Sequence, residues 1–441
     1  MIPFVPILLI GAIVGAVAIV APKEPKYMEI PIFKPNGKQN AKFELKDPST
    51  VVLDHKPSVD LKHRGRSLIF HSNDEESVEA ISAYGIARLT IEAFKRQEKI
   101  LHDYRLIPSV KLSAMTSKIY PHAKKNFKDE VVEGVNGEFS INDGVGEIRL
   151  FNSAKHFATT AHEQGHGILH SLNAKYLCHA KLVYRALHES FADLSVIFSR
   201  SSFEIKNKKE GFVEVDFLTQ DRFILASGWR QRRVDWEEKD PGGDTRRDPY
   251  DSTAMRDSRS YVPESMEEHN QSIPLTSLIL ESMRDTYLFV VNDRELKSTP
   301  FGKKPRMVMQ YYQRLLMSAV STAPEFNSLE EFGEILKNTQ YKMASECPQI
   351  AAFDSFDNKF LKVKREDLCR FHNIAREQFN QWFEHLRANL ARVTGMVTRG
   401  GLTRAEIEER FGVTDGSTRG SQCRRGLPHA GAGYEVEDRR G

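Results

Sequence analysis

The chain has 441 residues and a nearly balanced charge, with 63 lysines and arginines against 60 aspartates and glutamates. This balance leaves no strong overall field, so we expect no nucleic-acid partner. Its 40% hydrophobic and 28% charged residues are ordinary for a globular protein, and its length suffices for about two or three domains.

The N-terminal stretch IPFVPILLIGAIVGAVAIVA, residues 2–21, is apolar and uncharged. A helix of about 20 apolar residues crosses a bilayer, so we predict that residues 1–21 are a transmembrane segment or a signal peptide and contact the membrane. An A-V-A stretch inside it would serve as a cleavage motif, although no Lys or Arg precedes the run. Lys23 and Lys26 follow it and would favour a cytosolic position for the next residues.

The segment after the apolar run differs in composition from the rest of the chain. Residues 22–75 are rich in Pro, Lys and Asp, and we predict a linker or pro-segment with some strands. A helical stretch then begins, SVEAISAYGIARLTIEAFKRQEKIL. Residues 135–153 hold β-prone runs around N-D-G at 142–144, which predicts a β-hairpin.

The stretch TTAHEQGHGILHSL, residues 159–172, predicts a metal-binding helix. His162 and His166 are four residues apart, so both project from one helix face toward one point. Glu163 lies roughly 100° around the helix and would hold a water rather than the metal. Apolar residues follow helical periodicity on the core side, namely Phe157, Ala161, Ile168 and Leu172.

The H-E-x-x-H pattern alone does not identify a site, because ordinary helices also contain histidines. A third ligand is required. The metzincin pattern places a histidine where this chain has Leu172. His170 lies on the same face, but a straight helix carries it too far along the axis to complete a tetrahedral site.

A second helical segment, YRALHESFADLSVIF at 184–198, offers a better third ligand. Glu189 and Asp193 are four apart and share a face. Glu189 would bind the metal, and Asp193 would accept a hydrogen bond from the outer nitrogen of a ligating histidine. The alternative, a pair of exposed acids, is disfavoured because the segment is too apolar to lie free in water, with Leu187, Phe191, Leu194, Ile197 and Phe198.

These two motifs together resemble the thermolysin-like gluzincins, whose signature is H-E-x-x-H followed further along by E-x-x-x-D. All five residue types agree here. The resemblance implies that His162, His166 and Glu189 bind Zn²⁺, that Glu163 is the general base, and that Asp193 orients a histidine.

The resemblance extends weakly to both sides of these motifs. Before them, Asn136-Gly137 fits the place where the family binds peptide along an edge strand, although an N-G pair is equally typical of a turn. After them, Arg256 matches a substrate-binding arginine and His269 a second catalytic histidine. The family's Asn-Ser after that histidine is Gln271-Ser272 here. The tyrosine that assists catalysis in the family has no clear counterpart in this chain. Tyr176 and Tyr184 are both candidates for it.

The C-terminal part is helical by periodicity over residues 305–395, as in MVMQYYQRLLMSAV and LEEFGEILKNTQ. This resembles the all-helical domain that closes one side of the family's cleft. From residue 396 the composition shifts to Gly, Arg and Thr, and we expect a disordered tail over 396–441. None of the four cysteines has zinc-finger spacing, and Cys347 and Cys369 are close enough in sequence to pair.

The sequence therefore predicts an α+β protein. A zincin-like catalytic domain at 76–295, with a small sheet plus metal-binding helices, is followed by a mainly α-helical domain at 296–395. The predicted function is a zinc-dependent metalloendopeptidase that hydrolyses a peptide or protein substrate. Glu163 would be the general base that accepts a proton from a zinc-activated water. Because peptidases of the resembled family are typically secreted, we expect it to be membrane-anchored or secreted.

Two other classes stay open. One is a catalytically inactive zinc-binding scaffold, motivated by the departure after His269. The other is a membrane-bound helical regulator without metal, motivated by the N-terminal run and the basic tail.

Overall fold

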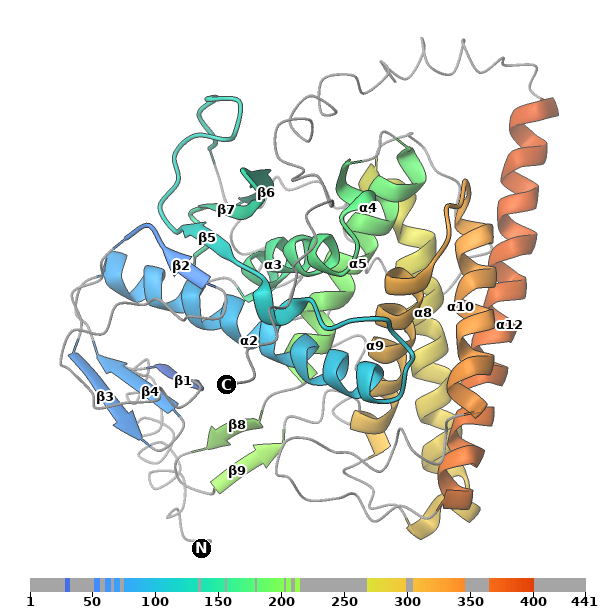
Figure 1. Cartoon of the computed structure of the whole chain (residues 1–441). Coiled ribbons are helices and arrows are strands. Elements are labelled where there is room, and N and C mark those ends of the chain that lie inside the picture. Colours follow the sequence, from blue (N-terminus) through green and yellow to red (C-terminus); the bar gives the residue numbers. More distant parts are fainter. Residues whose placement is uncertain are drawn as a thin grey trace, which may run out of the picture.

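The structure is a computed structural model. It describes residues 28–31, 51–55, 60–64, 67–71, 75–133, 136–154, 157–178, 181–201, 204–207, 211–214, 268–298, 304–345 and 365–399. Helices dominate these residues, and the strands form small sheets, so the fold class is α+β (Figure 1).

The main sheet has four strands in the order β2-β5-β7-β6. They are β2 (Val51–Leu53), β5 (Ser117–Tyr120), β7 (Val145–Phe151) and β6 (Asn136–Asn142). β2 and β7 each pair in parallel with β5, whereas β6 pairs antiparallel with β7. Within this sheet β6 is therefore an edge strand, and β2 comes from the predicted linker.

The predicted hairpin is confirmed, and its turn explains the register. Asp143 and Gly144 connect β6 to β7 with φ angles of 49° and 76°. Positive φ at both central residues is the geometry of a type I′ turn, whose twist matches that of paired strands. The turn aligns Asn142 with Val145 and, at the far end, Asn136 with Phe151.

Two smaller sheets accompany the main one. β1 (Met28–Pro31), β4 (Ser67–His71) and β3 (Asp60–Arg64) form an antiparallel sheet in the order β1-β4-β3. β8 (Glu204–Asn207) pairs antiparallel with β9 (Gly211–Glu214). The strands expected within residues 22–75 are thus present as β1, β3 and β4.

Eight α-helices are described, together with the short 3₁₀ turns Leu112–Ala114 and Glu295–Ser298. The helices are α2 (Glu75–Asp103), α3 (Phe157–Leu172), α4 (Lys175–Cys178), α5 (Leu182–Ser201), α8 (Glu268–Asn292), α9 (Lys304–Thr322), α10 (Leu329–Ser345) and α12 (Arg365–Arg399). The stretches predicted as helices before and after the metal motifs lie within α2, α9 and α10.

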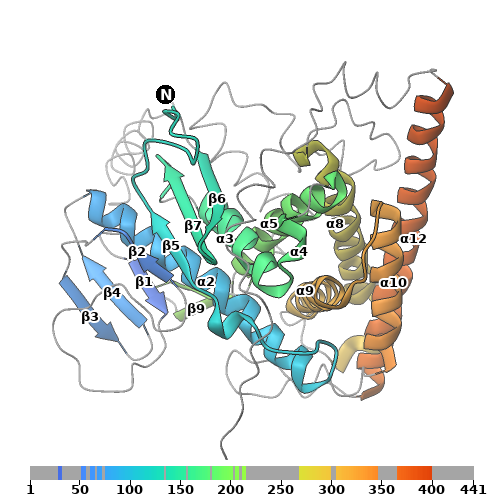
Figure 2. The same cartoon turned by 45° about the horizontal axis from the view of Figure 1, so that its top comes forward.

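One continuous hydrophobic core joins these elements, from Ile81 in α2 to Leu386 in α12. α5 packs against both α3 and α8, and Figures 1 and 2 show α3 and α5 between the main sheet and the C-terminal helices. The sheet edge and two buried helices thus meet at one place. The predicted domain boundary at residue 295 stays a prediction, because core residues lie on both sides of it.

Some predictions concern residues outside this description. No described helix is long and apolar enough to span a membrane, and residues 1–21 lie outside the described residues. α12 continues to Arg399, so the predicted start of the disordered tail at residue 396 is wrong, and the residues after Arg399 lie outside the described residues. Cys369 is disulfide-bonded, and the side chains of the other cysteines are not among those described.

A buried histidine in the C-terminal helices makes stability depend on pH. His372 of α12 is 3% exposed and packs edge-on against Tyr311, with ring centroids 5.0 Å apart. Burial, aided by the charge of Arg314, lowers its pKa from 6.5 to about 3. Between these values the unfolded chain takes up a proton that the folded chain does not. The free energy of unfolding therefore falls as the pH drops through this window.

We expect this histidine to contribute a loss of ~1.4 kcal/mol per pH unit over that window. His372→Phe should remove this contribution, so urea midpoints measured at pH 7 and pH 5 should move less in the variant than in the wild type. Equal shifts in both proteins would contradict this assignment of the acid sensitivity.

Candidate metal centre

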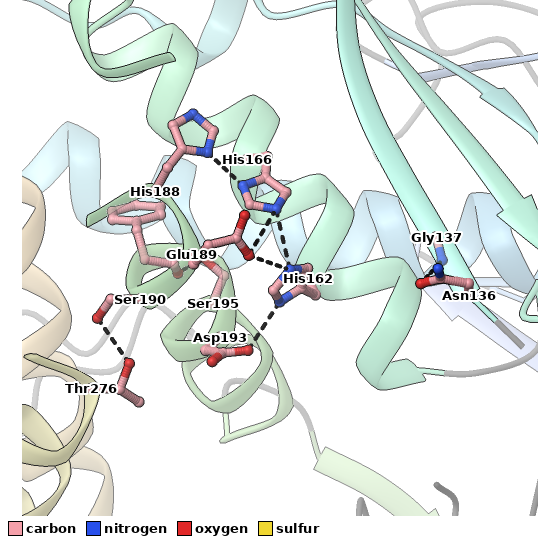
Figure 3. Close-up of polar contacts among 11 residues, drawn as sticks. Asn136, Gly137, His162, His166, His188, Glu189, Ser190, Asp193, Ser195 and Thr276 are labelled. Atoms are coloured by element: carbon pink, nitrogen blue, oxygen red, sulfur yellow. Dashed lines mark hydrogen bonds and ion pairs between the residues drawn. The ribbon is translucent and has the colours of Figure 1, made fainter. Parts of the chain in front are cut away.

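Three ligand atoms from two helices meet beside the main sheet. His162 and His166 stand one turn apart on α3, and Glu189 reaches them from α5 (Figure 3). His162 Nε2 lies 3.1 Å from His166 Nε2 and 3.3 Å from Glu189 Oε2. His166 Nε2 lies 3.7 Å from the same Glu189 oxygen. These side chains are 15%, 9% and 13% exposed, so the group is largely shielded yet accessible.

The separations fit a zinc ion. Zinc bonds to His nitrogen and carboxylate oxygen are about 2.0–2.2 Å long, so ligand atoms at two corners of a tetrahedron lie about 3.4 Å apart. The observed edges lie close to that value. Within the described part of the chain, this is the single group of three or more His, Cys, Asp or Glu side chains arranged to hold a metal. The donor set thus suits zinc in both chemistry and geometry.

Asp193 holds the outer nitrogen of His162. Its Oδ1 lies 3.0 Å from His162 Nδ1, and Asp193 is 5% exposed. Burial would lower the pKa of His162, but the hydrogen bonds to Asp193 and Glu189 outweigh it and raise this pKa from 6.5 to about 10. A carboxylate in this position sets the tautomer and ring orientation of a ligating histidine.

Sequence reasoning missed a further histidine at this centre. His188 of α5 is 4% exposed, and its Nδ1 lies 2.5 Å from His166 Nδ1. The two rings are nearly parallel, with an interplanar angle of 20° and centroids 4.7 Å apart, and they meet through these nitrogens (Figure 3). Burial, with the charge of His166, lowers the pKa of His188 well below 6.5, so this ring is neutral. The sequence did hold a signal, since His188 follows Tyr184 by four and precedes Phe191 by three on the apolar face.

Glu163 faces the edge strand. It is 6% exposed, and Gly137 of β6 lies so close that an added Cβ there would stand 2.8 Å from Glu163 Oε1. Two residues further along β6, the Phe139 ring lies 5.9 Å from that of His166. Asn136 Oδ1 accepts a hydrogen bond from the Gly137 backbone N–H. The predicted peptide-binding pair therefore lies beside the predicted general base.

A glycine sets the distance between α3 and α5. A Cβ on Gly165 would stand 2.8 Å from the Cα of Ala192 and 2.8 Å from Ser195 Cβ. The Ala192 Cα belongs to the backbone of α5, and the Ser195 Cβ is bonded directly to that backbone. Neither atom can move away unless the helix itself moves. Gly165 therefore lets α5 approach closely enough for Glu189 to reach the histidines.

We expect Gly165→Ala to destabilise the protein, although alanine gains up to about 1 kcal/mol in helix propensity. Forcing a methyl group into this contact should cost roughly 1–3 kcal/mol and should weaken metal binding by moving α5. Gly167→Ala is the matched control, because the nearest atom there is the flexible end of Met115 at 2.7 Å. Thermal unfolding measures the stability of both variants, and zinc titration measures their metal affinity. Equal losses in the two variants would contradict the proposed role of Gly165.

Other predicted residues do not join this group. His170 lies in the last turn of α3 outside the three-ligand group. Tyr176 and Tyr184 are buried in the core, where Tyr176 donates to Val320 O and Tyr184 accepts from Phe326 N. The backbone of His269 lies in the first turn of α8, and its side chain is not among those described. Arg256 lies outside the described residues.

Comparisons with known protein families, with curated proteins and with solved structures find no match for this chain.

Proposed function

We propose that this chain is a zinc-dependent metalloendopeptidase with a zincin-like catalytic domain. The observation that carries the proposal is the spacing of His162 Nε2, His166 Nε2 and Glu189 Oε2, with edges of 3.1, 3.3 and 3.7 Å. Two imidazoles and one carboxylate are the protein ligands of catalytic zinc sites in peptidases such as thermolysin, where a fourth position stays open.

The residues around this group supply the rest of the proposed reaction. Zinc bound there would lower the pKa of a water molecule to about 7 and polarise a peptide carbonyl. The Glu163 carboxylate would accept the proton of the attacking water and pass it to the nitrogen of the leaving amine. Asp193 would keep His162 in the orientation and tautomer that leave Nε2 facing the metal.

An edge strand beside this group suits a peptide substrate. An extended peptide can add to such an edge through backbone hydrogen bonds, and its side chains then alternate between the two faces. Because Gly137 contacts Glu163, a peptide bound along this end of β6 would pass close to the carboxylate. Arg256 and His269 complete the proposal as groups that bind the substrate carbonyl oxygen and stabilise its negative charge.

The proposed location is extracytoplasmic, anchored or secreted through residues 1–21. Two observations support it. The N-terminal run has the length and composition of a membrane segment, and Cys369 is disulfide-bonded. Disulfides persist in oxidising compartments and are rare in the cytosol.

Cleavage of a quenched fluorescent peptide library tests the proposed activity. We expect cleavage by the purified protein, loss of cleavage with a chelator, and recovery on adding zinc. Metal analysis of the same preparation should give one zinc per chain. Zinc at that stoichiometry with no cleavage across the library would favour the inactive scaffold, and absence of zinc would favour the metal-free regulator.

A further inference from the structure

The connection between β5 and β6 is unusually long. It runs over residues 121–135, of which 121–133 are described, whereas most connections take about four to six residues. Lys124, Lys128 and Val131 in this segment are exposed, Val131 by 70%. Long ordered surface loops are commonly binding loops. We call residues 121–133 the arm, and Figure 1 shows it as the long loop that leaves β5 at the upper left.

The edge strand β6 shows on which face of the main sheet the arm lies. Gly137 and Phe139 of β6 contact α3. Successive side chains of a strand point to opposite faces, so Glu138 points away from α3. Its Oε2 accepts a hydrogen bond of 2.9 Å from the backbone N–H of Phe127 in the arm. The arm therefore lies on the outer face of the sheet, opposite the metal helices.

A second side chain holds the arm from the neighbouring strand. Arg149 of β7 is paired with Glu138 and shares its face. Its guanidinium donates to the backbone oxygens of Lys125 and Asn126 and lies 4.1 Å from the centre of the Phe127 ring. The arm is thus attached to both strands at the β6 side of the sheet.

Further hydrogen bonds keep the arm in one shape. At its base, His122 Nε2 lies 3.1 Å from the backbone oxygen of Glu76 in α2. At its tip, Asn126 Oδ1 accepts hydrogen bonds of 2.9 Å from the backbone N–H groups of Lys128 and Glu130. A loop that is already ordered loses little conformational freedom when a partner binds to it. The arm therefore has the properties of a pre-formed contact surface.

A peptide bound to β6 would pass beside this surface. In the described main sheet β6 pairs with β7 alone, and a peptide added on its other side would lie about 4.8 Å away. One set of its side chains would point toward α3 and the metal ligands, and the alternate set would point to the face that carries the arm. Glu138 holds the arm and follows Gly137, which contacts Glu163. The arm is therefore level with the place of the proposed cleavage.

We propose that the arm is the outer wall of the substrate site and contacts those side chains of a bound peptide that point away from the metal. The partner it fits is an extended polypeptide segment whose side chains are recognised on both faces. Arg149 is the positioning residue that holds the arm there. This inference rests on the proposed peptidase function and names the class of its substrate.

Arg149→Leu tests the proposal, with Lys118→Leu as the matched control. Lys118 stands on the same face of the sheet but contacts Asp54 and the Tyr120 ring instead of the arm. With a decapeptide from the quenched library, we expect Arg149→Leu to raise KM about tenfold and to leave kcat nearly unchanged, because a released arm must be ordered on binding. Lys118→Leu should keep the KM of the wild type, and both variants should keep its zinc affinity. Equal KM values in all three proteins would overturn the proposal.

Two alanine-substituted decapeptides separate contact with the arm from a general loss of stability. One has alanine at every odd position and the other at every even position, so each lacks the side chains of one face. Both should bind the wild type more weakly than the parent peptide. In Arg149→Leu one of them should lose this disadvantage, because its missing side chains no longer meet the arm, and the other should keep it. Unchanged disadvantages for both peptides would overturn the proposal.

Fluorescence anisotropy of the labelled peptides measures this binding without turnover. The expected pattern together with no cleavage by the zinc-loaded wild type would support the arm and overturn the proposed peptidase function. Chelator-sensitive cleavage together with no effect of Arg149→Leu on either peptide would overturn the role of the arm and leave the peptidase function in place.

Discussion

Glu163→Gln is expected to abolish measurable peptide hydrolysis while zinc stays bound. Glutamine keeps the size of the side chain beside Gly137 but cannot accept the proton of the attacking water. Loss of a general base costs typically 10²- to 10⁴-fold in rate, so at least about that loss is expected here. The metal ligands are His162, His166 and Glu189 in this proposal, so zinc content should not change.

The measurement is paired. Turnover of the best library peptide and zinc content are determined on the same preparation of wild type and variant. A variant that loses zinc in proportion to activity would show that Glu163 supports the metal rather than the water. Unchanged turnover would remove Glu163 from the reaction.

Glu189→Ala should cause the largest loss of zinc affinity. The structure brings Glu189 Oε2 within 3.3 and 3.7 Å of the two histidine nitrogens, so its removal leaves two ligands for the metal. The loss should exceed the roughly 10- to 100-fold expected for Asp193→Asn, which removes only a hydrogen-bonding partner of a ligand. His170→Ala should change little, because His170 lies outside the group.

Titration of zinc against a competing chelator ranks these three variants. His162→Ala serves as the reference for losing a ligand. If His170→Ala weakened zinc binding as much as His162→Ala did, or if Glu189→Ala were nearly silent, the assignment of the third ligand and with it the gluzincin resemblance would fail.

Local spacing accounts for what could be predicted. The turn of an α-helix places His162 with His166, and Glu189 with Asp193, whatever the rest of the fold does. The N-D-G turn likewise needs positive φ at two positions, which favours a type I′ hairpin wherever it occurs. The helices α2, α9 and α10 follow from apolar periodicity. These features depend on residues close together in the chain.

Packing between distant segments decided the rest. The rotation of α5 against α3 sets which of its polar residues faces the histidines, and this depends on the contact at Gly165. The same rotation brings His188 to His166, which a sequence pattern could only place on an apolar face. The parallel pairing of β2 with β5, from opposite ends of α2, was also outside the reach of local patterns.

By itself, therefore, the sequence determined which side chains could serve as metal ligands and on which helix faces they stand, because helical periodicity acts over a few residues. Only the tertiary structure decided that the two faces meet with their three candidate ligand atoms 3.1 to 3.7 Å apart, beside β6, the edge strand of the described main sheet. That meeting depends on close packing of segments far apart in the chain, where a single methyl group at Gly165 would separate them.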